Sequence, residues 1–174
     1  MKKDLHGIIK EKKNMDDICY TPIGIIRTPF KTREKMPIQP PGAQGIRGTV
    51  KIKADYVAGL KDLEGFSHII LIYHFHLSKG YDLIVAPFLD DQPRGVFATR
   101  APKRPNSIGF SIVKLNAVKE DEVEIENVDM IDETPLLDIK PYVPEFDAQV
   151  KVKIGWLAKR GDQVKQTSSD TRFT

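Results

Sequence analysis

Short apolar runs that alternate with polar residues recur along the chain, and turn-forming residues separate them. The clearest unit covers residues 109–132, where two alternating runs flank an acidic turn and predict a β-hairpin. Residues 45–53 alternate Val50 and Ile52 with lysines, which is typical of a half-exposed strand. Residues 67–76 are apolar on both faces, and we expect a central strand there.

Weaker patterns predict the remaining elements. Short strands are expected at 18–27, 82–88 and 94–100, a core strand or turn at 133–147, and short helices at 56–66 and 151–161. About seven short strands without regular strand–helix–strand alternation favour a mainly β fold over a doubly wound one. No Gly-x-Gly-x-x-Gly turn follows any predicted strand. We therefore predict a small, non-Rossmann β-barrel with short helices.

A long irregular segment covers residues 28–45. Its prolines exclude a helix or a central strand, so we expect a loop. Loops beyond about 12 residues are uncommon inside compact domains and are often functional. Arg33, Lys35 and Gln39 on this segment are therefore candidates for ligand contact.

The chain has 174 residues, which is enough for one compact domain. We predict a polar N-terminal extension at 1–17, the β-barrel domain at 18–160 and a polar tail that frays at 161–174. No apolar run of signal-peptide length follows the N-terminus, and no stretch reaches the roughly 18 apolar residues of a membrane span. These features predict a cytoplasmic protein without membrane contact.

Charge is nearly balanced, because 27 Lys and Arg residues oppose 24 Asp and Glu residues, for a formal charge of +3. This balance permits nucleic-acid binding without demanding it, so the local distribution has to decide. Residues 95–111 concentrate Arg100, Lys103 and Arg104 beside two prolines that stiffen the backbone. A rigid basic loop loses little entropy when it binds a carboxylate or a phosphate. We expect an anion site here, with a solvated turn as the alternative.

Three histidines, His68, His74 and His76, are expected on one face of the predicted strand at 67–76, because strand side chains alternate. His74 and His76 have the spacing with which one strand presents two imidazoles to a metal ion. No third ligand has a distinctive spacing, so hydrogen bonding to a ligand or a buried neighbour is favoured. A metal-dependent β-barrel enzyme remains the alternative.

Two polar clusters follow the predicted hairpin. Residues 132–135 have the composition of a tight turn, and such a turn can also aim a carboxylate and backbone amides at a ligand. Farther along, Asp138, Lys140 and Tyr142 are polar residues on an apolar segment. Burial of Asp138 or Lys140 would require a partner, either each other or a ligand.

Four segments together resemble the TsaA-like TrmO family of S-adenosylmethionine-dependent tRNA methyltransferases. The segments are "TREKMPIQPPG", "FSHIILIYHFH", "GVFATRAPKRPNSIGFS" and "DETPLLDIKPYVP", and the resemblance extends from Tyr20 to Asp147. It implies a β-barrel enzyme that binds S-adenosylmethionine and works as a homodimer. The implied reaction methylates the exocyclic nitrogen of threonylcarbamoyladenosine beside the tRNA anticodon.

The resemblance also implies site residues. Contacts to the cofactor would come from Gln39, Pro40, His76, Leu77, Arg100, Phe110, Asp132, Glu133, Thr134 and Pro135. Arg100 would pair with the methionine carboxylate, and Phe110 would pack against the adenine or the methionine chain. The attacking nitrogen is amide-like and must lose a proton, so Asp138 and Tyr142 are our catalytic candidates. Lys103 and Arg104 would bind tRNA phosphate.

Two positions depart from the family pattern. Glu133 stands where the family has glycine in Asp-Gly-Thr-Pro, and Ser107 stands where proline is common. Many members also carry an additional C-terminal domain, whereas this chain ends soon after Trp156. We therefore expect tRNA affinity to come from the barrel's own surface, and a noncatalytic cofactor-sensing or RNA-binding module is a further alternative.

Overall fold

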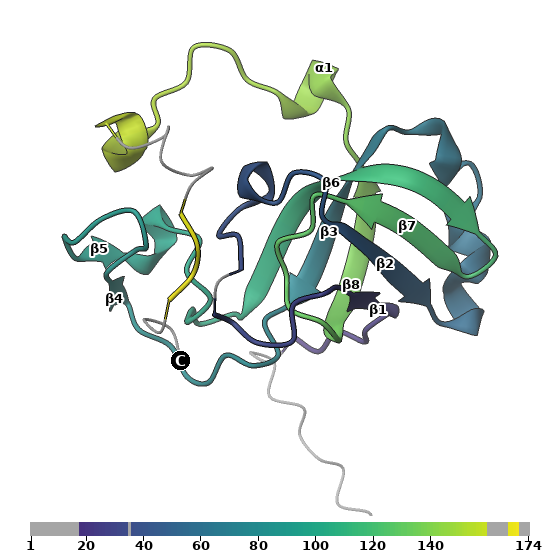
Figure 1. Ribbon diagram of the computed structural model, residues 1–174, viewed down its shortest axis with the longest axis horizontal. Coiled ribbons are helices and arrows are strands. Elements are labelled where there is room, and N and C mark those ends of the chain that lie inside the picture. The colour runs from purple at the N-terminus through teal and green to yellow at the C-terminus, as the bar shows by residue number, and fades with distance from the viewer. Residues whose placement is uncertain (1–17, 35, 160–166, 171–174) are drawn as a thin grey trace, which may run out of the picture.

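The computed structural model describes residues 18–34, 36–159 and 167–170 (Figure 1). The mainly β fold predicted from the sequence is confirmed. Six strands close into a barrel in the order β1-β2-β7-β6-β3-β8, and β4 and β5 form a separate two-stranded sheet. The strands are β1 Gly24–Arg27, β2 Arg47–Ile52, β3 His68–His74, β4 Ile84–Val85, β5 Arg94–Gly95, β6 Ile108–Lys119, β7 Glu122–Glu126 and β8 Thr134–Pro141.

The helices are short, as predicted. They are α1 Pro144–Asp147 and the 3-10 helices η1 Pro40–Gly42, η2 Ala54–Leu60, η3 Leu63–Gly65, η4 Val96–Ala98 and η5 Gly155–Lys159. The helices expected at 56–66 and 151–161 are thus 3-10 turns. Among the described residues, no helix has the length and apolar surface that a bilayer crossing requires.

The barrel closes because β6 and β8 each pair with two neighbouring strands. The first half of β6 pairs with β3, and its second half pairs with β7, the predicted hairpin partner. The register of β6 shifts between Leu115 and Ala117, and that of β3 shifts between Ile72 and Tyr73. Such bulges increase bend and twist, which closure of a small barrel needs. β8 then pairs with β3 on one side and with β1 on the other.

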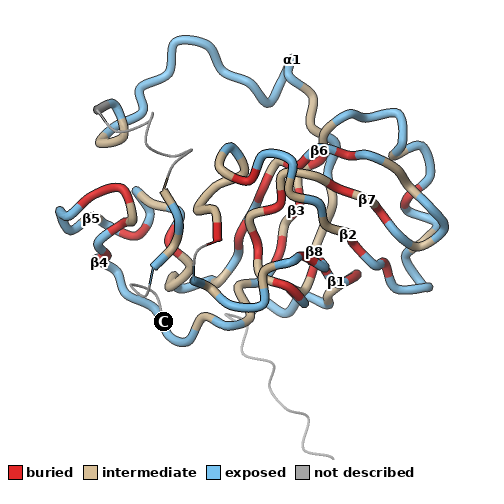
Figure 2. The backbone as a smooth tube through the Cα atoms, viewed as in Figure 1, coloured by how far each residue is buried: buried red, intermediate tan, exposed pale blue. Residues whose placement is uncertain are grey.

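The barrel core follows from strand alternation. Ile69, Leu71 and Tyr73 of β3 are buried, whereas the residues between them are only partly buried (Figure 2). β3 is hydrogen-bonded on both sides, which confirms the predicted central strand. Val50 and Ile52 of β2 are also buried, with Lys51 exposed between them, as the half-exposed pattern predicted.

An arm made of residues 80–101 stands beside the barrel and carries β4, β5 and η4 (Figure 1). The strands predicted at 82–88 and 94–100 were too long, since each keeps two paired residues. The buried carboxylate of Asp90 accepts bonds from Arg94 Nη2 at 2.7 Å and Nε at 3.1 Å, and this pair turns the chain between them. Val85 and Val96 pack in a small second core.

The described part of the tail, residues 167–170, does not fray as predicted. Ser168 forms a β-bridge with Pro37, and Ser169 N donates to the Met36 carbonyl at 2.9 Å. Met36 N donates in return to Ser169 Oγ at 3.1 Å. The tail thereby pairs with the loop at 28–45, and in Figure 1 this yellow segment runs between the arm and the barrel. The predicted extension at 1–17 lies outside the described residues.

Gly109 on β6 is opposite Tyr73 on β3, and no larger residue fits there. An added Cβ would collide with the Tyr73 ring and lie 2.7 Å from Phe75 Cζ. We expect Gly109→Ala to lower the free energy of unfolding by about 1–3 kcal/mol, because the rings are packed in place. Urea denaturation measures the change. Gly59→Ala is the matched control, since nothing lies within 4 Å of its Cβ position; equal losses in both variants would contradict the packing argument.

Candidate functional site

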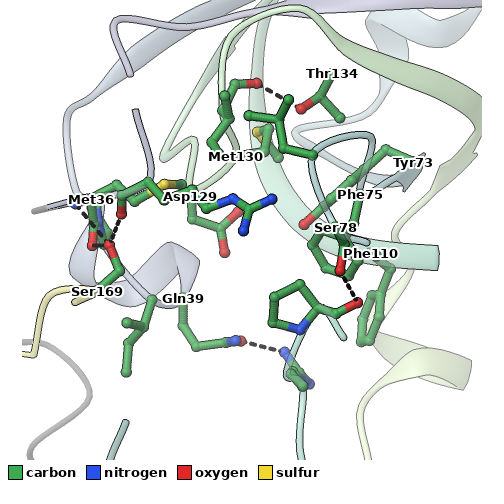
Figure 3. Close-up of a pocket in the computed structure, with 18 of the residues that line it drawn as sticks. Met36, Gln39, Tyr73, Phe75, Ser78, Phe110, Asp129, Met130, Thr134 and Ser169 are labelled. Atoms are coloured by element: carbon green, nitrogen blue, oxygen red, sulfur yellow. Dashed lines mark hydrogen bonds between the residues drawn. The ribbon is translucent and has the colours of Figure 1, made fainter. Parts of the chain in front are cut away.

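A cavity of about 400 Å³ opens at one end of the barrel. Its walls come from the loop at 28–45, the end of β3, the basic segment after η4, the start of β6, the turn at 129–134 and the described tail. Figure 3 shows Met36 and Ser169 on one side of the cavity and Tyr73, Phe75 and Ser78 on the other. Segments far apart in the sequence thus form a single concave site of a size suited to a small organic ligand.

Three residues predicted to contact the cofactor meet at the cavity wall. Arg100 Nη1 donates to Gln39 Oε1 at 2.6 Å. The Arg100 guanidinium also lies 4.6 Å from the centre of the Phe110 ring. A guanidinium stacked on an aromatic face keeps its outward N–H groups able to bind a carboxylate. The structure therefore brings Gln39, Arg100 and Phe110 together, as the motifs indicated.

A second cavity, of about 790 Å³, lies on the other side of this wall. Gln39, Arg100 and Phe110 line both cavities. Pro40 lines the second cavity, together with the aromatic side chains of His68, Phe97 and Trp156. Trp156 Nε1 donates to the Ala98 carbonyl at 2.8 Å, and Arg94 lies 5.7 Å from the centre of its ring.

His76, Leu77 and Thr134 line the first cavity, as predicted for cofactor contacts. β3 ends at His74, and His76 N donates to the His74 carbonyl in the turn that follows. Because of this turn, His76 is not part of the strand face that carries His68 and His74. Burial, with the charges of His74 and Arg33 nearby, lowers the pKa of His76. Its ring is therefore mainly neutral at pH 7.

Asp132 has a different role from the predicted one, because it lines neither cavity. Its carboxylate is buried and accepts bonds from Thr28 N at 2.9 Å and from Lys31 Nζ. Burial opposes ionisation, but the Lys31 and Thr28 donors outweigh it, so the pKa of Asp132 lies below its usual range. Asp132 thus anchors the loop at 28–45 to the turn that precedes β8.

Glu133 and Pro135 also stay outside both cavities. Glu133 has a φ of 63°, a left-handed conformation that favours glycine. This explains the family glycine at the position where the sequence departs from the pattern. Arg27 Nη1 donates to Glu133 Oε1 at 2.6 Å, and the pair lies on the surface. Pro135 is part of β8 and is aligned with Ile25 of β1.

The structure does not bring the catalytic candidates Asp138 and Tyr142 to either cavity. Asp138 Oδ2 accepts from Lys140 Nζ at 2.7 Å on the outer surface of β8, which is the mutual pairing expected from the sequence. The Tyr142 ring packs edge-on against His68, with ring centres 6.4 Å apart. Both side chains are on the part of β8 and its extension that leads away from the turn at 129–134.

The basic residues predicted to bind RNA are placed differently from each other. Arg104 Nη1 donates to the carbonyls of Thr99 at 3.1 Å and Ala101 at 3.2 Å, so it folds the basic segment onto itself. Arg104 also lines the first cavity. Lys103 lines neither cavity, and its carbonyl accepts from Asp82 N at 3.3 Å.

Asp129 is one of several residues of the first cavity that the motifs did not single out. It points into the first cavity (Figure 3), and its Oδ1 accepts from Ser111 Oγ at 2.6 Å. Ser111 Oγ is also 3.0 Å from the Tyr73 hydroxyl. Desolvation raises the pKa of Asp129 to about 6. The sequence signal that could have indicated Asp129 is an acidic residue just after an alternating strand, three residues before Asp132.

No three His, Cys, Asp or Glu side chains of the described residues gather closely enough to hold a metal ion. His74 is exposed at the end of β3, whereas His76 lines the first cavity. The two-residue spacing therefore does not direct both imidazoles to one point.

The sequence profile of the tRNA-methyltransferase O N-terminal domain matches residues 25–148. The chain belongs to the TrmO family. The family predicted from the motifs is thus confirmed. The matched range contains all barrel strands except Gly24, the first residue of β1, and most of the residues that line the two cavities.

Relatives and solved structures agree with this assignment. A protein of Pyrococcus abyssi described as a probable S-adenosyl-L-methionine-binding protein is 53% identical over 156 residues, which is 90% of this chain and 85% of that protein. A mouse tRNA (adenine(37)-N6)-methyltransferase is 32% identical over 155 residues, 85% of this chain and 36% of that protein. The crystal structure of TrmO from Pseudomonas aeruginosa superimposes with a TM-score of 0.68 at 37% identity.

The similarity covers most of this chain but only part of the length of some relatives. The superposition covers 80% of this chain and 62% of the Pseudomonas aeruginosa protein. The alignment with the mouse enzyme covers little more than a third of that enzyme's length.

The anchoring role of Asp132 predicts a pH-dependent loss of stability in this TrmO barrel. We expect Asp132→Asn to lower the free energy of unfolding by about 1–3 kcal/mol near neutral pH, because two donors lose a charged acceptor. The folded pKa is depressed, so the stabilisation is present above the unfolded value of about 3.9 and is lost as pH falls through the folded pKa. Urea denaturation of both proteins between neutral and acidic pH measures this difference.

The matched control is Asp121→Asn, which removes a surface ion pair to Lys51. Exposed ion pairs contribute little to stability, so Asp121→Asn is expected to lower the free energy of unfolding much less than Asp132→Asn does. Asp132→Asn and the natural chain should approach each other in free energy of unfolding as the pH falls below the unfolded pKa of Asp132. A difference that stays constant there would contradict the anchoring role.

Proposed function

We propose that this chain is an S-adenosylmethionine-dependent methyltransferase that acts on the exocyclic nitrogen of threonylcarbamoyladenosine beside the tRNA anticodon. The observation that carries the proposal is the wall of Gln39, Arg100 and Phe110, which lines two adjoining cavities of a TrmO-family barrel. Methyl transfer requires the attacking nitrogen and the sulfonium to meet in line. Because the two cavities share lining residues, molecules bound in each would lie next to one another.

The first cavity suits the cofactor. Phe110 and Phe75 offer apolar surface to the adenine or the methionine chain, and Arg100 offers a guanidinium to the methionine carboxylate. Relatives such as the Pyrococcus abyssi protein are described by their binding of S-adenosyl-L-methionine. When bound, the cofactor supplies the methyl group as an electrophile, and the neutral His76 ring is able to accept or donate a hydrogen bond beside it.

The second cavity suits a nucleobase of the RNA. Phe97 and Trp156 present aromatic faces there, and single-stranded bases stack on such faces. Phe97 is 77% exposed, so its ring is accessible to a large partner. The name of the mouse relative, a tRNA (adenine(37)-N6)-methyltransferase, supports an adenine substrate in tRNA. Cytoplasmic location stays a prediction from the sequence.

The decisive experiment incubates the purified chain with S-adenosylmethionine and tRNA and analyses the nucleosides by mass spectrometry. Threonylcarbamoyladenosine is expected to gain one methyl group. A matched tRNA that lacks the threonylcarbamoyl group tests the substrate, since methylation of unmodified adenosine instead would overturn the finer assignment. Cofactor binding without methylation of either tRNA would favour a noncatalytic cofactor-sensing module.

Arg100 is expected to contribute most of its effect through the cofactor. We expect Arg100→Gln to weaken S-adenosylmethionine binding about 10- to 100-fold in calorimetry, because a charge-assisted bond to the carboxylate is lost. Arg47→Gln removes the same charge from an exposed position on β2 and should leave the affinity unchanged. Equal affinity of the natural chain and Arg100→Gln would remove Arg100 from the cofactor site.

We further infer that two copies of the chain pair through the arm. Tyr81, Leu83 and Ile84 of the arm are between 55% and 64% exposed, so this projecting element carries large apolar side chains at its surface. Exposed apolar side chains that gather on one element are typical of interaction sites. The homodimer implied by the motifs would cover these side chains.

A charge placed on the arm should separate the two copies. We expect Ile84→Lys to weaken dimerisation at least about tenfold in sedimentation velocity, because a cation would be buried without a partner. Val152→Lys, at an exposed apolar position outside the arm, is the matched control and should stay dimeric. A natural chain that sediments as a monomer at all concentrations would overturn the inference.

A further inference from the structure

Asp129 is a carboxylate that the fold places inside the first cavity and that the implied cofactor contacts do not use. It lies between the Met36 and Ser169 side of the cavity and the Tyr73 side (Figure 3). Ser111 donates its one hydroxyl proton to Asp129 Oδ1, so the Tyr73 hydroxyl is the donor in its own bond to Ser111. The side chain is therefore held in place by a buried chain of donors from β3 and β6.

Arg100 and Asp129 carry opposite charges and line the same cavity. The Arg100 guanidinium is close enough to favour the charged form of the Asp129 carboxyl. An α-amino acid carries its carboxylate and its ammonium on one carbon. A neighbouring guanidinium and carboxylate are thus a matched pair for such a head group, since each binds the group of opposite sign. The other candidate carboxylate, Asp132, is occupied by Lys31 and Thr28 outside the cavity.

We propose that Asp129 binds the α-ammonium group of the methionine part of S-adenosylmethionine, while Arg100 binds its carboxylate. This assignment rests on the proposed function of the first cavity. The ammonium donates to Asp129 Oδ2, and Oδ1 keeps the bond from Ser111. No covalent step is involved, and Asp129 acts as a binding residue that orients the amino-acid end of the cofactor.

The proposal predicts that cofactor binding depends on pH. The pKa of Asp129 in the unliganded chain is raised to about 6 by desolvation, and an adjacent ammonium lowers it. Binding then requires the charged carboxylate, so affinity falls as pH drops below 6, by up to about tenfold per pH unit. Tyr73 stays neutral in this range, because burial raises the pKa of its hydroxyl far above its usual value. His76, Asp170, Arg33 and Arg104 also line the cavity, so their contribution must be measured separately.

The test compares the natural chain with Asp129→Asn, an isosteric change that keeps an acceptor for Ser111. Calorimetry measures three ligands: S-adenosylmethionine, S-adenosylhomocysteine and methylthioadenosine. The first two carry the ammonium, and the third lacks the whole amino-acid part. We expect Asp129→Asn to weaken the first two about 10- to 100-fold and to leave methylthioadenosine unchanged. The unchanged ligand also reports that the cavity is intact.

The pH series isolates Asp129 from the other cavity groups. The decline in affinity below pH 6 should be lost in Asp129→Asn, and any pH dependence that remains comes from another group, such as His76. Asp55→Asn removes a carboxylate from an exposed position on η2, and it should match the natural chain at every pH.

Each other outcome overturns the proposal in a different way. If Asp129→Asn weakens the binding of S-adenosylmethionine but not that of S-adenosylhomocysteine, Asp129 contacts the sulfonium and not the ammonium. Unchanged affinities with loss of methylation would make it a proton acceptor. If the natural chain binds S-adenosylmethionine but Asp129→Asn binds all three ligands equally well, this inference fails alone. If the natural chain does not bind S-adenosylmethionine at all, the proposed function fails with it.

Discussion

The pairing of β1 with β8 is the constraint on which the site depends. It aligns Gly24 with Leu136 and closes the barrel, so the chain that leaves β1 runs beside the turn that enters β8. Thr28 N is thereby brought to the Asp132 carboxylate, 104 residues away in sequence, and the Thr28 hydroxyl reaches the Met130 carbonyl at 2.9 Å. A long proline-rich loop has few internal bonds, and these anchors hold it as a cavity wall.

Closure also separates two aspartates that look alike in sequence. Asp132 faces Lys31 and Thr28 outside the cavity, and its pKa is lowered by these donors against the effect of burial. Asp129, three residues earlier, faces the cavity and a serine, and desolvation raises its pKa. The two carboxylates therefore have opposite electrostatic environments within one turn. One stabilises the loop, and the other is available to a cationic ligand group.

The tail and the arm complete the site from outside the barrel. Ser169 pairs with Met36, and its Oγ also donates to the Arg33 carbonyl, so the described tail supports the loop that carries Gln39. The arm places Phe97 and Ala98 beside Trp156 at the second cavity. The sequence predicted a fraying end for the tail and regular strands for the arm. Their actual contacts depend on partners that are distant in sequence.

The fold was largely predictable because strand alternation is local. Val50 and Ile52 against exposed lysines, and the hairpin of β6 and β7, can be read from neighbouring residues alone. The bulge at Leu115–Ala117 could not, since it depends on how the twisted barrel sheet closes on itself. The short lengths of β4 and β5 could not either, since these strands pair with each other beside the barrel. The motifs also indicated Gln39, Arg100 and Phe110, and the structure brings these residues to one wall.

The amino-acid sequence by itself determined the β class, the order of the elements, the family and the basic segment that carries Arg100. Tertiary structure decided which polar residues face the cavity. Asp138 and Tyr142 point elsewhere, Asp132 is an anchor, and Asp129 enters the cavity, although all four occur within 14 residues. The physical reason is that the direction of a side chain alternates along a strand and changes abruptly at a turn. Its partner is then set by pairing with strands that the local sequence does not contain.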